Sequence, residues 1–113
     1  MNYKIVSQKK IAVLTISGNI GKDDKDSLMN CSKELLEDDS ESVVLYFKNV
    51  TSIESIILRE LTLLQHEVRQ KKRLKVVGLN LQLKTFLTEK GVIRSSEVGA
   101  NFNEVIFTLN KMP

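Results

Sequence analysis

The sequence predicts a single α/β domain built on a mostly parallel β-sheet. Its 113 residues fit one compact domain, since such domains commonly hold about 100–150 residues. Short β-branched apolar runs alternate with stretches of helical period after an opening pair of strands, as expected for parallel strands joined by helices. The only proline is the last residue and no Gly/Ser-rich linker interrupts the chain. We therefore expect residues 1–113 to form one domain with an opening β-hairpin and about four helices.

The chain opens with two strands and a helix. Residues 3–7 and the β-branched run 11–16 predict the two strands of a hairpin, and Gly18 lies in the turn signal that ends the second strand. From about Asp23 the apolar period becomes helical. The apolar positions of this first helix are Leu28, Cys31, Leu35 and Leu36.

The middle of the chain predicts a buried strand and the longest helix. Residues 42–47 are almost continuously apolar, which is typical of a parallel strand covered on both faces. Thr51 and Glu54 then have the spacing of a capping box, so we expect the second helix to begin there and to end near Lys72. Its apolar stripe is Ile57, Leu61, Leu64 and Val68, joined by Leu58.

The last third predicts two more strands and two shorter helices. Residues 74–78 form the next strand, and a helix follows that Gly91 ends in a left-handed conformation. A weak strand is expected over residues 93–98, and Asn101 is expected to cap the final helix. The apolar faces of these helices are Leu79, Leu83, Phe86 and Leu87, then Phe102, Val105, Ile106 and Leu109. The predicted order is β-β-α-β-α-β-α-β-α, with the first strand at an edge.

Charge and composition favour a protein without nucleic-acid or membrane partners. The formal charge is +3, and the one dense basic stretch, residues 69–75, contains no aromatic side chain for base stacking. A phosphate-binding stretch and the cationic end of a helix are the two interpretations, and we favour the second. No apolar run approaches the roughly 18–20 residues that cross a bilayer, and no signal peptide opens the chain. We expect a cytoplasmic location and no direct membrane insertion.

The residues that usually carry catalysis are scarce and poorly placed. The only histidine, His66, is predicted to point away from the core stripe of its helix, and the only cysteine, Cys31, to point into the core. One histidine and one cysteine do not make a transition-metal site, and the five glycines form no phosphate-binding loop. We expect no enzyme activity, no metal and no cofactor.

Several segments resemble the STAS domain family, in the order and spacing that the family shows. Residues 16–20 (ISGNI) resemble the family's strand-end "lxGel" segment, which precedes its first helix, and residues 43–50 (VVLYFKNV) resemble its "vvlDlsxv" segment. Residues 51–58 (TSIESIIL) resemble the family's "xxiDSsGl" motif, residues 74–78 (LKVVG) its next strand, and residues 86–92 (FLTEKGV) the end of its third helix. The resemblance covers nearly the whole chain and implies the STAS fold.

The resemblance also implies a phosphorylation site and a partner-binding surface. In the anti-sigma factor antagonists of this family, the serine after the motif aspartate is phosphorylated by a kinase anti-sigma factor, and that serine corresponds to Ser55. Three positions depart from the pattern: Glu54 replaces the motif aspartate, Ile57 the motif glycine and Tyr46 an aspartate of the preceding strand. The expected partner-binding residues are Ser52, Glu54, Ser55, Ile56 and Ile57.

Three functions follow, in order of preference. The first is a protein-binding regulatory module resembling an anti-sigma factor antagonist, switched at Ser55, with an anti-sigma factor or kinase-like regulator as partner. The second is a constitutive STAS-like subunit of a larger assembly, such as a lipid-transport ATPase. The third is a small enzyme or ligand-binding protein that uses the crevice at the strand ends. The sequence leaves the oligomeric state open.

Overall fold

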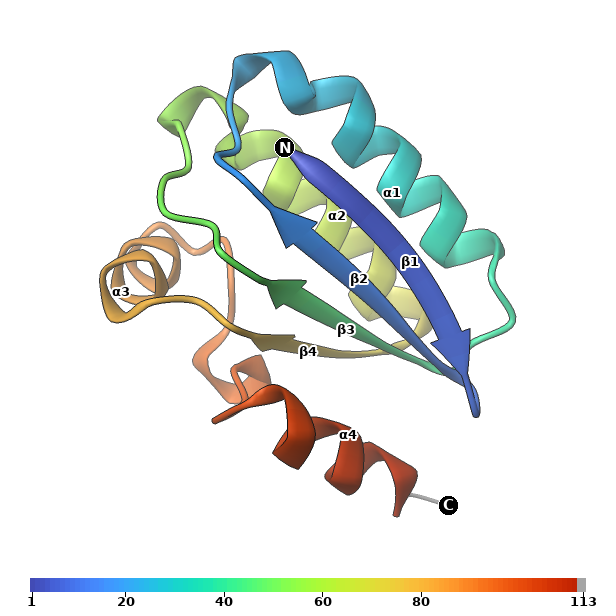
Figure 1. The fold of residues 1–113 in the computed structure, drawn as a ribbon. Helices are drawn as coiled ribbons and strands as arrows, with labels where there is room; N and C mark the ends of the chain where they lie inside the picture. Colours follow the sequence, from blue (N-terminus) through green and yellow to red (C-terminus); the bar gives the residue numbers. More distant parts are fainter. Residues whose placement is uncertain (112–113) are drawn as a thin grey trace.

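The computed structural model describes residues 1–111, which form a four-stranded mixed sheet with helices on both faces (Figure 1). The strands lie in the order β1 (Asn2–Gln8), β2 (Ile11–Ser17), β3 (Ser42–Phe47) and β4 (Arg73–Val77). Strand β1 pairs antiparallel with β2, and the other two pairings are parallel. The predicted α/β class, the opening hairpin and the edge position of β1 are confirmed.

The hairpin register decides which side of β1 faces the core. Lys9 and Lys10 both have positive φ values, 53° and 66°, as a two-residue turn matched to the twist of the strands requires. This turn sets Ile5 opposite Leu14. The side chain of Ile5 therefore packs against the main core, together with the side chain of Tyr3 two residues before it.

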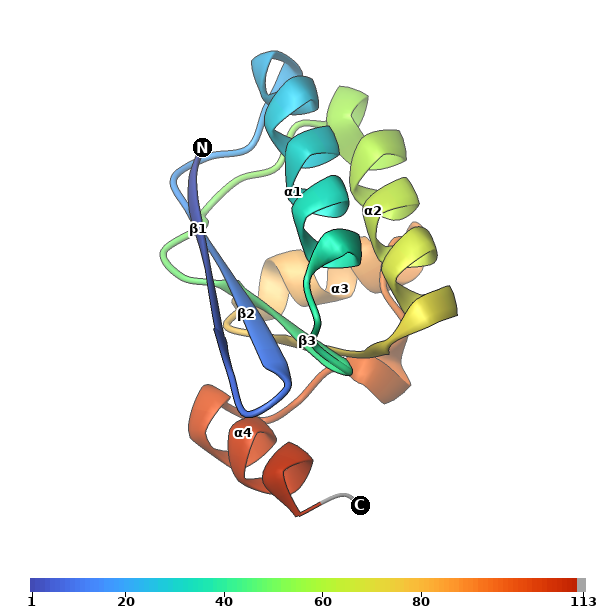
Figure 2. The ribbon, with the colours of Figure 1, turned by 90° about the vertical axis from the view of Figure 1, so that its right-hand side faces the viewer.

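Helices cover the sheet unequally. Helices α1 (Lys25–Glu37) and α2 (Leu58–Lys71) lie side by side on one face, and α4 (Phe102–Asn110) lies on the other (Figure 2). Helix α3 (Leu81–Glu89) adds Leu83 and Leu87 to the core on the α1–α2 side. Three short 3₁₀ helices complete the fold: η1 (Lys22–Asp24), η2 (Ser55–Ile57) and η3 (Ser95–Glu97).

The predicted start of the second helix is wrong. Helix α2 does not begin at a capping box: the Thr51 hydroxyl donates to Asn19 Oδ1 at 2.7 Å, and the chain stays extended until η2. The cause is Ile53, which enters the core and pairs with Ile20 in an isolated parallel bridge. A capping box would have required Thr51 to turn toward its own helix instead.

The expected strand over residues 93–98 is also absent from the described residues. Val92 and Ile93 turn inward and are each 3% exposed, with both backbone N–H groups bonded to the carbonyl of Leu87 at the end of α3. A 3₁₀ turn follows, and only Val98 makes a bridge to Val76 of β4. The expected end of α3 at Gly91 is confirmed by its φ of +72°, as is the cap at Asn101, whose Oδ1 accepts from Glu104 N–H at 2.8 Å.

Candidate functional site

Two loops meet beyond the carboxyl ends of β2 and β3, where the sequence placed the functional motif. The backbone N–H of Ile20 donates to the carbonyl of Ser52 at 3.1 Å, and the N–H of Glu54 donates to the carbonyl of Ile20 at 2.9 Å. These bonds extend the parallel pairing of β2 and β3 by one short step. The segment that leads into η2 is therefore held by main-chain bonds.

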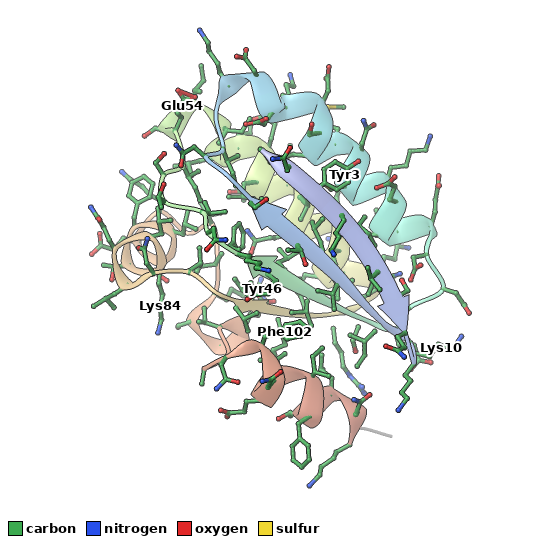
Figure 3. The ribbon with its side chains drawn as sticks, viewed as in Figure 1. Tyr3, Lys10, Tyr46, Glu54, Lys84 and Phe102 are labelled. Carbon is green, nitrogen blue, oxygen red and sulfur yellow. The ribbon has the colours of Figure 1, made fainter. Side chains whose placement is uncertain are left out.

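Glu54 fastens the same two loops through its side chain. Its carboxylate accepts the backbone N–H of Lys22 at 2.7 Å, and Figure 3 shows it at the end of the molecule where the chain enters α1. Gly21 makes room for this contact, because a Cβ atom there would lie 2.1 Å from Glu54 Oε2. The extra methylene of Glu54, relative to the aspartate of the STAS motif, lets the carboxylate bridge to η1. Sequence reasoning missed this role for Gly21.

The exposed part of the motif is small and is interrupted only by the buried Ile53. Ser52, Glu54, Ser55 and Ile56 are all exposed, and 69% of the Ile56 surface is accessible. We call these four residues the η2 surface. Ser55 is the first residue of η2 and thus lies at the amino-terminal end of the continuous η2–α2 segment.

The expected contact at Ile57 needs correction. Ile57 is only 2% exposed and belongs to the core, where it begins the stripe that α2 turns toward the sheet. Its backbone N–H bonds to the carbonyl of Glu54, which directs the side chain inward. Ile56 is therefore the single large apolar side chain of the η2 surface.

Tyr46, the third departure from the motif, lies on the other side of the sheet. Its ring stacks on Phe102 of α4, with 5.1 Å between ring centroids and 20° between ring planes (Figure 3). It packs with Val44 and Val77 in the smaller core under α4. Tyr46 therefore serves the packing of α4 rather than the η2 surface.

The two residues considered for catalysis lie as predicted. Cys31 is fully buried, and burial, with a smaller contribution from Glu34, raises the pKa of its thiol to about 12. A thiol with that pKa holds its proton at neutral pH. His66 is exposed on α2, with its Nε2 atom 3.1 Å from Gln70 Nε2.

Two cations of the basic stretch, residues 69–75, make contacts within the fold. Arg69 forms a two-pronged ion pair with Glu97 of η3, with both N–O distances at 2.7 Å. Lys72 Nζ donates to the carbonyls of Leu35 and Asp38 at the end of α1. These contacts support the helix-end interpretation over a phosphate-binding stretch.

Within residues 1–111, no helix has the length and apolar character needed to cross a membrane.

The order of elements, the mixed four-stranded sheet and the loop pair before α2 define the fold of a STAS domain. No protein-family model and no curated protein matches the chain, whereas solved structures do.

One such structure is the unphosphorylated anti-sigma factor antagonist SpoIIAA. It has 9% sequence identity, a TM-score of 0.78 and coverage of 99% of both chains; the phosphorylated form of the Bacillus protein matches as well. An anti-sigma factor antagonist from Mycobacterium paratuberculosis has 13% identity, a TM-score of 0.80 and coverage of 97% of this chain and 94% of its own. A sulfate transporter family protein from Wolinella succinogenes has 17% identity, a TM-score of 0.75 and coverage of 91% and 87%. At these identities the likeness establishes the shared fold.

Proposed function

We propose that this chain is a cytoplasmic protein-binding regulatory domain, not an enzyme, and that it docks its partner through the η2 surface. The observation that carries the proposal is Ile56, an apolar side chain that is 69% exposed next to the exposed Ser55. An exposed apolar group beside polar ones is typical of a surface that another protein covers. An anti-sigma factor or a kinase-like regulator is the partner that the fold favours.

The loop pair makes this surface ready for docking. The bonds of Ile20 to Ser52 and Glu54, and of the Glu54 carboxylate to Lys22, fix the backbone on which Ile56 is presented. A surface that is already ordered loses little conformational entropy when a partner binds. Docking at η2 therefore needs no rearrangement of this chain.

Phosphorylation of Ser55 would switch the docking. A phosphate would add a charge of about −2 beside Ile56, at a helix start whose N–H groups and dipole tolerate an anion. Arg59 is exposed one helical turn further on, so it supplies a cation on the same side of the helix. The structural neighbour SpoIIAA, which is known in unphosphorylated and phosphorylated forms, supports this part of the proposal.

A constitutive subunit of a larger assembly, such as a lipid-transport ATPase, is the second candidate. It is favoured by the Glu54 carboxylate, which is already bonded to Lys22 and so is less available to a partner than a free acidic side chain. A structural neighbour from a sulfate transporter family agrees with a role inside an assembly. In this case the partner would stay bound whatever the charge at position 55.

An affinity pull-down from the native host with two matched variants tests the docking surface. Ile56→Asp should abolish capture of the partner, because a charge would have to be desolvated at the contact. Phe107→Asp is the control, since Phe107 is similarly exposed, at 61%, but lies on α4. Capture that survives Ile56→Asp and is lost with Phe107→Asp would place the interface on α4 and contradict the proposal.

A further inference from the structure

A groove of about 610 Å³ runs between α1 and α2 on the outside of the helical layer. Figure 2 shows the two helices running side by side in the same direction. Leu28 and Leu64 lie buried among the residues that line it. Met29 on α1 and Leu63 on α2 line it too and are exposed, at 57% and 43%. Apolar side chains thus reach solvent from both walls.

The groove and Ile56 of the η2 surface lie on the same side of the η2–α2 segment. Ile56 lies seven residues before Leu63, which is two helical turns, so both fall on one side of the η2–α2 segment. Together with Met29 they make three of the large exposed apolar side chains of the described residues. An apolar strip of this kind on a small domain marks an interaction surface.

The acidic groups on the α2 wall already have partners. Glu60 pairs with Lys25 across the groove at 3.9 Å, and Glu67 accepts from the hydroxyl of Ser32 at 3.0 Å. Lys33 on α1 and Arg59 on α2 line the groove, are exposed, and form no ion pair among residues 1–111. The cations left without an ion-pair partner are therefore one on each wall, Lys33 and Arg59. Glu37 and Glu67, both exposed, keep their negative charge toward the far end of the groove.

The cross-groove contacts give the spacing of these two cations. Lys25 lies level with Glu60 and Ser32 with Glu67, so Lys33 lies level with position 68. That position is nine residues beyond Arg59, or about 13 Å along the axis at a rise of about 1.5 Å per residue. Lining residues run from Lys25 to Glu37, a length of about 18 Å, or roughly three helical turns.

We propose that this groove binds an amphipathic helix of a partner protein, about three turns long. Its apolar stripe would lie on Met29 and Leu63, and an acidic residue on each edge would meet Lys33 and Arg59. A helix fits because its apolar residues at every third or fourth position match a groove bounded by two helices. Arg59 is the one contact that this interaction shares with the Ser55 switch, whereas Met29, Leu63 and Lys33 lie outside the η2 surface.

Two synthetic peptides test the proposal. Each is a 14-residue helix with a leucine stripe, one with glutamates and the other with lysines on both edges, and binding to the full chain is measured by fluorescence anisotropy. The glutamate peptide should bind about tenfold more tightly, since it gains two surface ion pairs where the lysine peptide meets two like charges. Leu63→Asp should weaken it by about tenfold or more, with circular dichroism confirming the fold. Phe107→Asp should leave it unchanged.

A charge-reversal pair separates the groove from the net charge of the protein. Lys33→Glu with Arg59→Glu should reverse the preference between the two peptides. Lys71→Glu with Arg73→Glu changes the net charge equally at exposed positions outside the groove, and should preserve the preference for the glutamate peptide.

Reversal by both pairs, or amide NMR shifts confined to residues outside α1 and α2, would overturn the proposal. A dimer in sedimentation that Leu63→Asp dissociates would also overturn it, because the occupant would then be a second copy. Lys33→Glu, on α1 and outside the η2 surface, should weaken binding of the glutamate peptide without changing capture of the η2 partner, so failure of the η2 switch is distinguishable from failure of the groove.

Discussion

Lys72 joins the ends of two helices through one ammonium group. Its Nζ atom donates to the carbonyls of Leu35 and Asp38, at 2.6 Å and 2.8 Å, and to the hydroxyl of Ser40 at 2.9 Å. The sequence suggested that this cation meets the negative end of its own helix. In the structure it meets the free carbonyls at the end of α1, which carry the same partial charge.

Replacing Lys72 by methionine should therefore destabilise the fold. The apolar chain is kept while three acceptors lose a charged donor, so we expect a loss of about 1.5–3 kcal/mol in the free energy of unfolding. Urea denaturation of both proteins measures it. Lys71→Met is the matched control, because Lys71 is exposed and should change stability by less than about 0.5 kcal/mol. Equal effects of the two substitutions would show that the contacts of Lys72 add nothing.

Cys31 gives the molecule a dependence on alkaline pH. Its thiol has a pKa of about 12 in the fold, raised above the unfolded value of about 8.5 because burial disfavours the thiolate. The folded state thus holds the proton more tightly, so this contribution to stability is full below the unfolded pKa and is lost as the pH rises toward 12. Thermal melts should fall more steeply for the wild type than for Cys31→Ala between about pH 9 and 11. Parallel curves would contradict a buried protonated thiol.

At the scale of elements, α2 is the main support of the sheet. Leu61 is fully buried and Leu64 is 2% exposed, so Leu61→Ala and Leu64→Ala should each cost about 2–5 kcal/mol in urea unfolding. Leu63, at 43% exposure, provides the comparison within the same turn of the helix, and Leu63→Ala should cost clearly less. Losses below about 1 kcal/mol at both buried positions would mean that the helix is rotated relative to this structure.

Elements with a strong local pattern were predictable. The continuous apolar run of β3 indicated a strand covered on both faces, and the stripe of α2 indicated which side of that helix is buried, because the period of 3.6 is set by local geometry. The start of α2 was not predictable, since the extended path before η2 depends on the pairing of Ile53 with Ile20, which is far away in sequence. Ile93 misled in the same way: it is β-branched and was assigned to a strand, but it packs in the core after α3 without entering the sheet.

At the scale of the whole molecule, the candidate site combines what was predictable with what was not. The motif resemblance placed Ser55 and Ile56 on an exposed helix start, where the structure has them. The hydrogen bond from the backbone N–H of Lys22 to the Glu54 carboxylate, and the groove between α1 and α2, form only when loops and helices distant in sequence meet. Such contacts leave no periodic signal in the sequence.

The two faces of the sheet differ in what their helices contribute. Helix α4 closes one face over a small core, whereas α1 and α2 cover the other and carry both proposed interaction surfaces (Figure 2). The η2 surface lies where these helices meet the loops from β2 and β3. A partner docked there would therefore contact the side of the domain that α1 and α2 cover.

The most direct test of the switch measures the affinity of the pulled-down partner for four proteins by calorimetry. Ser55→Ala adds no charge to the η2 surface and should bind as the wild type does. Ser55→Asp places a charge beside Ile56 and should weaken binding about tenfold or more, an effect smaller than that of a phosphate. Ser95→Asp is the matched control, since Ser95 is also exposed and also begins a 3₁₀ helix. Wild-type affinity in Ser95→Asp together with weakened binding in Ser55→Asp is the predicted result; equal affinities for all four proteins would contradict the switch and place the constitutive subunit first.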